Sequence, residues 1–157
     1  MAGVAPSYKA TDMSKFKVAI ISASWHKEIC DALVDGAHRA LKAALVAVDP
    51  VIYVPGSFEL PLAAQFALDS GADAAVVLGV VVKGETPHFD YVCQGVTDGV
   101  MQVSLSRNKP VGFGVLTVDN EAQAIARSGI PGSKEDKGFD ATIAALELLR
   151  IKHSVIG

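Results

Sequence analysis

The chain has 157 residues, half of them hydrophobic and a fifth charged, which fits one globular domain with a sizeable core. Its formal net charge of −3 gives no electrostatic basis for binding nucleic acid, and its apolar runs are too short to span a bilayer. Residues 1–15 lack the apolar core of a signal peptide. We therefore expect a cytoplasmic protein that binds neither nucleic acid nor membrane.

The first half of the chain alternates between apolar and amphipathic segments. Residues 17–24 are a short apolar run that predicts a strand. The next apolar residues recur at helical spacing and share one predicted face: Ile29, Leu33, Ala37, Leu41, Ala44 and Leu45. Residues 51–56 predict a second strand. A helix follows it, with Ser57 as the expected N-cap and Gly71 as the stop.

The central segment carries the clearest strand signal. Residues 73–82 are apolar without polar alternation, as expected for a strand covered on both faces. A helix is predicted from Pro87 to about Leu105. Its apolar stripe consists of Val92, Val96, Val100 and Val103.

The last part of the chain repeats the alternation. Residues 109–118 predict a fourth strand, and a short helix follows it with either Asp119 or Asn120 as its cap. A final helix is expected over residues 139–151, after a linker. Strict alternation of strand and helix predicts an α/β fold with a parallel sheet and helices on both faces.

Right-handed crossovers bring the loops that follow the strands to one edge of such a sheet, where open α/β sheets bind ligands. Those loops are SASWH, PGSFE, KGETPH and TVDNE. Most of the unusual residues of the chain lie in or beside them. The coincidence predicts a ligand site at this edge.

The stretch GETPH is suited to binding a phosphate. Thr86 is a good N-cap and Pro87 a preferred first helical residue, so the backbone N–H groups of a helix start would be free for an anion. His88 falls in the first turn and could take up and return protons. A plain structural turn explains the same residues.

Other single residues also leave two interpretations open. Trp25, the one tryptophan, could stack on a flat heterocycle or plug the edge of the sheet. Glu59 could accept from sugar-like hydroxyls or simply stabilise a helix start. A structural role also explains three further residues. Arg127 can be a cation at a helix C-terminus, Lys137 a solvated charge of the linker, and Phe113 a core side chain.

Cysteine and histidine spacing predicts no metal site. Cys30 and Cys93 lie far apart without a motif, which indicates two reduced, mostly buried thiols. His26, His38 and His153 also lack partners at metal-ligand spacing.

Taken in order, the blocks SASWHKEICDALVDGA, VPGSFELPLAAQ, LGVVVKGETPHFDYV, GVLTVDNEAQAIARSG and EDKGFDA resemble the 6,7-dimethyl-8-ribityllumazine synthases. The resemblance runs from about Lys17 to Leu149. It implies a flavodoxin-like α/β/α sandwich with a four-stranded parallel sheet, and a single domain over residues 16–157. Residues 1–15 would be an arm that adds a strand to the sheet of a neighbouring subunit.

The implied enzyme is a transferase of riboflavin biosynthesis. It condenses 5-amino-6-(D-ribitylamino)uracil with 3,4-dihydroxy-2-butanone 4-phosphate in the penultimate step, without cofactor or metal. His88 would be the proton-transferring residue. Glu85, Thr86 and Arg127 would bind the phosphate, with Glu85 directed to solvent. The uracil substrate would contact Trp25, Ser57, Phe58, Glu59, Val80, Val81, Val82, Phe113 and Lys137.

The resemblance assigns Phe113, Arg127 and Lys137 to the pocket of an adjacent subunit, which requires an oligomer. We expect a homopentamer rather than a capsid of twelve pentamers, because the linker SGIPGSKEDKG is slightly longer than in members that form closed shells. Riboflavin synthase would be a neighbour in the pathway. The alternative is a non-catalytic flavin- or lumazine-binding protein on the same scaffold.

Overall fold

The structure, a computed structural model, describes residues 3–9 and 11–157. Within them, four strands form one parallel sheet in the order β2-β1-β3-β4. The strands are β1 (Val18–Ala23), β2 (Ile52–Val54), β3 (Ala74–Val82) and β4 (Val111–Val118). With β1 and β3 side by side at the centre, the order is that of a flavodoxin-like sheet. The predicted α/β fold is confirmed.

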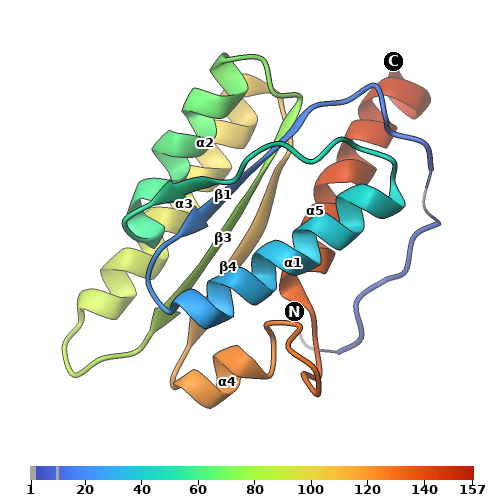
Figure 1. Ribbon diagram of the computed structural model, residues 1–157. Coiled ribbons are helices and arrows are strands. Elements are labelled where there is room, and N and C mark those ends of the chain that lie inside the picture. The colour runs from blue at the N-terminus through green and yellow to red at the C-terminus, as the bar shows by residue number, and fades with distance from the viewer. Residues whose placement is uncertain (1–2, 10) are drawn as a thin grey trace.

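The helices cover both faces of the sheet (Figure 1). On one face lie α1 (Lys27–Ala43) and α5 (Lys137–Arg150), and on the other α2 (Leu60–Asp69) and α3 (His88–Arg107). A short helix, α4 (Glu121–Ile125), follows β4. Each face has its own apolar cluster, one around Leu33 and Leu149 and the other around Leu60 and Val96. The molecule is therefore a three-layer sandwich.

The central strand β3 has the burial that its sequence predicts. The segment from Ala74 to Val80 is buried throughout, since helices cover both faces. Val81 and Val82 are only half-buried. The strand thus emerges from the core at its carboxyl end.

Two details of the first half differ from the prediction. Leu45 is 63% exposed and has a left-handed φ of 61°, because α1 ends at Ala43 and the chain turns before Leu45 can join the buried face. Ser57 does not cap α2. It begins a 3₁₀ turn, η1 (Ser57–Glu59), in which the Glu59 carboxylate accepts from the Gly56 N–H instead.

Of the two caps predicted for α4, the structure has Asn120, since its Oδ1 accepts from the Gln123 N–H at 3.0 Å. Helix α5 begins at Lys137, earlier than predicted, because Asp136 Oδ1 accepts from the Phe139 N–H. A π-helical turn, η2 (Ile151–Ile156), extends it to the end of the chain.

The N-terminal segment passes on the α5 side of the molecule (Figure 1). Residues 3–9 form neither helix nor strand. Met13 and Phe16 are buried in the cluster beneath α1 and α5, and the Met13 N–H donates to the Ala44 carbonyl at 2.9 Å. Among the described residues, Met13 is therefore the first buried one, while Tyr8, Lys9 and Thr11 lie over Ala44 and α5.

Both cysteines are free thiols, as the sequence predicts. Cys30 is fully buried and Cys93 partly buried.

Candidate active site

A cavity of about 720 Å³ opens at the carboxyl ends of β1, β2 and β3. It lies beside the switch point between β1 and β3, where sheets of this order bind ligands, and its size suits a small molecule. The lining comes from the loop after β1, the η1 turn, the end of β3 and the first turns of α3: Trp25, His26, Gly56, Ser57, Phe58, Glu59, Val80, Val81, Val82, His88, Tyr91 and Val92.

Trp25 presents its indole at the mouth of this cavity. The side chain is 69% exposed, and a Cβ on Gly56 would come within 3.4 Å of the indole Cδ1, so the ring edge lies over the Gly56 backbone. The Cys30 thiol donates to the Trp25 carbonyl at 3.1 Å, and burial raises the pKa of this thiol to about 11, which keeps it a donor. The Cys30 bond thus holds the backbone of Trp25, while the exposed indole is free to stack on a flat ring.

The η1 turn contributes Ser57 and Glu59 to the lining of the cavity. Glu59 Oε2 accepts from the Gly56 N–H at 2.9 Å, and among the described residues its other oxygen has no protein donor. Ser57 is buried, yet its Oγ has no partner within the described part of the chain. The Oγ is closed off from the cavity beside Gly79, where an added Cβ would come within 2.6 Å of it, so the Ser57 hydroxyl adds no accessible polar group to the lining.

Phe58 and the end of β3 form the apolar part of the lining. Phe58 packs on α3 where Gly95 leaves room, since a Cβ there would come within 2.6 Å of the Phe58 ring. Val81 and Val82 lie at the open end of β3. An apolar wall with a few polar groups is the usual composition of a small-molecule site.

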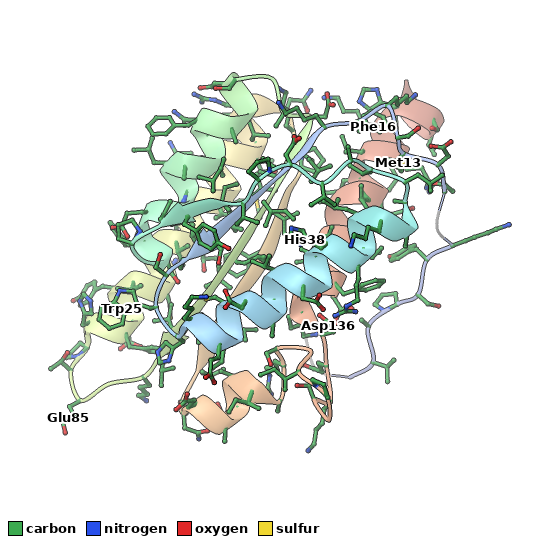
Figure 2. The ribbon with its side chains drawn as sticks, viewed as in Figure 1. Met13, Phe16, Trp25, His38, Glu85 and Asp136 are labelled. Atoms are coloured by element: carbon green, nitrogen blue, oxygen red, sulfur yellow. The ribbon has the colours of Figure 1, made fainter. Side chains whose placement is uncertain are left out.

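His88 is the first residue of α3, and its side chain is exposed to the cavity. Its N–H approaches Thr86 Oγ1 at 3.4 Å. Glu85 and Thr86 are exposed and do not line the cavity, and Figure 2 shows Glu85 at the tip of the loop before α3, pointing away from the fold. The loop GETPH therefore forms the rim of the cavity.

Phe113, Arg127 and Lys137 do not line the cavity. Phe113 extends from β4 toward the α2–α3 side and is 41% exposed. Arg127 follows α4, and Lys137 opens α5, with its N–H donating to the Arg127 carbonyl at 3.0 Å. The fold brings the two cations to each other, but not to the cavity of their own chain.

Four lining residues escaped the sequence-based prediction: His26, Gly56, Tyr91 and Val92. Tyr91 lies one helical turn after His88, and this i, i+3 spacing was a usable signal. His26 lines the cavity in a left-handed conformation, with φ 53°, which no spacing rule indicates.

Fold and site together define a class: an α/β protein with a small-molecule cavity at a sheet switch point, lined by an exposed indole, a carboxylate and a histidine. Across the described residues, no group of three or more histidine, cysteine, aspartate or glutamate side chains is placed to hold a metal ion. In the same residues, no helix is both long and apolar enough to cross a membrane.

Comparison with known sequences identifies the family. The family model for 6,7-dimethyl-8-ribityllumazine synthase matches residues 15–153. A relative of that name from Paenarthrobacter aurescens is 58% identical over 135 residues, covering 86% of this chain and 83% of its own. Another from Kineococcus radiotolerans is 54% identical (87% and 84% covered), and one from Streptomyces coelicolor is 50% identical (96% and 94% covered). The chain belongs to the 6,7-dimethyl-8-ribityllumazine synthase family.

Proposed function

We propose that this chain is a transferase that condenses 5-amino-6-(D-ribitylamino)uracil with 3,4-dihydroxy-2-butanone 4-phosphate to give 6,7-dimethyl-8-ribityllumazine, in the cytoplasm. The main support for this proposal is that Trp25, Glu59 and His88 line one cavity in a chain of this family. The reaction releases two water molecules and one phosphate and makes the penultimate compound of riboflavin biosynthesis, which riboflavin synthase would consume.

The uracil substrate fits the groups that line the cavity. Trp25 stacks on the pyrimidine ring, for which its exposed indole is suited. The free oxygen of Glu59 accepts from ribityl hydroxyls, and Ser57 and Phe58 hold the ribityl chain beside it. Backbone groups at the strand end bind the uracil edge: Val80, Val81 and Val82.

His88 supplies proton transfer. The amine of the uracil attacks the ketone, water leaves to give an imine, phosphate is eliminated, and ring closure releases a second water. Each step moves a proton, and an exposed imidazole on the cavity wall is placed to carry it. Holding the two substrates together supplies much of the remaining acceleration.

The phosphate binds at the rim, between the GETPH loop and a neighbouring chain. Thr86 and the backbone N–H of Glu85 lie at the start of α3, where a helix favours an anion. Arg127 reaches this phosphate from the adjacent subunit, as Phe113 and Lys137 reach the uracil pocket. The position of these three side chains outside their own cavity supports this sharing.

The shared site calls for a closed ring, and we propose a homopentamer. Its support is an exposed apolar surface on the outer side of α2 and α3, which a monomer would leave in water. That surface includes Leu62, Phe66, Met101 and Leu105. Residues 3–9, with Val4 fully exposed, are available to add a strand to a neighbour. Sedimentation at neutral pH tests the ring, since a capsid of twelve pentamers would sediment as a far larger particle.

The activity itself is tested by mixing both substrates with the purified protein and following the fluorescence of the lumazine product. We expect product in proportion to enzyme. A protein that binds lumazine tightly yet forms none would instead be the non-catalytic binding protein that the scaffold also permits.

A further inference from the structure

Arg127 and Lys137 share one carboxylate. Glu135 Oε2 lies 3.7 Å from Arg127 Nε and 3.5 Å from Lys137 Nζ. Asp140 lies 3.4 Å from Lys137 Nζ alone. Glu135 is therefore the one acidic side chain among the described residues that contacts both cations of the proposed phosphate and uracil pockets.

The backbone fixes Glu135 in this position. Its N–H donates to the Ala126 carbonyl at 3.0 Å, and its carbonyl accepts from the Gly129 N–H at 3.1 Å. An antiparallel bridge between Ser128 and Asp136 closes the same linker, and Asp136 is in turn paired with Arg39 of α1. Figure 2 places Asp136 at the junction of the linker with α1. The carboxylate is thus presented by a braced turn rather than by a loose loop.

The ion pairs of Glu135 are nevertheless loose. Neither has hydrogen-bond geometry, whereas the Asp69 carboxylate accepts from Arg107 at 3.1 and 3.2 Å. Arg127 is 44% exposed and Lys137 28% exposed. Such a pair contributes little stability, and an incoming anion can replace it at modest cost.

We propose that Glu135 is a positioning residue that occupies both cations in the empty site and weakens their hold on phosphate. When Arg127 binds an anion, the negative charge of Glu135 remains on the other side of that guanidinium. It therefore repels both the phosphate substrate and the released phosphate product. The phosphate must be bound and then let go, and Glu135 lowers affinity enough for release. This inference rests on the proposed function, in which Arg127 binds the phosphate.

The test is Glu135→Gln, which keeps the shape and removes the charge. We expect the inhibition constant of inorganic phosphate, and the KM for the butanone phosphate, to fall by about three- to ten-fold. The KM for the uracil substrate should stay within about two-fold, and added salt should shrink the difference. In an Arg127→Ala background, Glu135→Gln should change the inhibition constant of inorganic phosphate much less.

Two matched variants separate this role from a structural one. Asp140→Asn, which removes a partner of Lys137 only, should change the phosphate constant less than Glu135→Gln does. Glu147→Gln, which breaks a pair with Arg150 at the other end of α5, should change nothing. A phosphate constant that stays the same or rises in Glu135→Gln overturns the inference, because a merely structural carboxylate would loosen Arg127 and weaken binding.

The two proposals fail differently. If the wild-type protein formed no lumazine, the proposed function would be wrong. Calorimetry with inorganic phosphate would still test Glu135 on the intact assembly. If lumazine forms normally and phosphate affinity does not respond to Glu135→Gln, only the role of Glu135 falls.

Discussion

The cavity and the two cations of the linker before α5, Arg127 and Lys137, differ in whether their polar groups already have partners. In the cavity, Trp25 and His88 are exposed and one oxygen of Glu59 has no donor among the described residues. On the linker, Arg127 already donates to the Gln123 carbonyl and Lys137 faces two carboxylates. One chain therefore holds an open pocket for a heterocycle and, elsewhere, a preset pair of cations. The difference is what the proposed division of the site between neighbouring chains would require.

The largest expected effect is at His88. His88→Ala removes proton transfer, so kcat should fall at least ten-fold and up to the 10²–10⁴-fold range typical of acid–base catalysis. The KM for the uracil substrate should stay within about two-fold, since the stacking and hydroxyl contacts remain. His153→Gln, far from the cavity lining, is the matched control. Near-normal turnover at saturating substrate would remove His88 from the mechanism.

Arg127→Ala should act on the other substrate. A lost charge-assisted hydrogen bond costs about 1.5–3 kcal/mol, so the KM for the butanone phosphate should rise roughly 10- to 100-fold while that for the uracil changes little. Steady-state kinetics with each substrate varied in turn measures both values. The reverse pattern would show that Arg127 serves the uracil.

Mixing these two impaired variants, assayed at a butanone phosphate concentration well below the raised KM of Arg127→Ala, tests the division directly. In a closed ring assembled at random from equal amounts of His88→Ala and Arg127→Ala chains, about a quarter of the sites join an intact His88 to an intact Arg127. Co-refolding should therefore restore about a quarter of wild-type activity. A mixture no more active than its parts would mean that the cations serve their own chain.

A smaller effect is expected at Trp25. Trp25→Ala should raise the KM for the uracil roughly three- to ten-fold, in line with an aromatic contact worth about 0.5–1.5 kcal/mol. Trp25→Phe should stay within about two-fold, because a ring remains in the same place. Equal losses in both variants would argue against stacking.

The smallest change concerns the thiols. With the pKa of Cys30 raised to about 11 by burial, only about one molecule in a thousand carries the thiolate at pH 8. Iodoacetamide should modify the partly buried Cys93 first and Cys30 only on unfolding, as followed by mass spectrometry. Early labelling of Cys30 would mean that the hydrogen bond from its thiol to the Trp25 carbonyl opens in the native state.

Sequence patterns predicted the layers and most of the cavity. The apolar run at residues 73–82 and the loops at strand ends placed Trp25, Glu59 and His88 at one edge, as found. Leu45 was misplaced because helical spacing does not reveal where a helix stops. Ser57 was misplaced because its hydroxyl turns inward while Glu59 makes the cap.

The linker could not be interpreted in the same way. KEDKG has the composition of a solvated charge run, and nothing in its spacing shows that the chain returns to place Glu135 beside Arg127. That proximity depends on backbone bonds across the turn, from Lys137 to Arg127 and from Glu135 to Ala126. In the proposed ring, the pocket that receives these cations belongs to a second copy, so the spacing of residues in one sequence holds no pattern for it.

His26, in the loop after β1 that carries Trp25, has a left-handed backbone conformation, and this bears on the step at which the loop becomes ordered. A non-glycine residue at φ 53° costs on the order of 1–2 kcal/mol, which the packing of α1 and the Cys30 contact must offset as the chain folds. The conformational entropy of this loop is therefore lost when the chain folds, and ligand binding does not have to order the loop a second time. A ligand that stacks on Trp25 meets a preorganised surface, so its on-rate should be limited by encounter rather than by rearrangement of the loop.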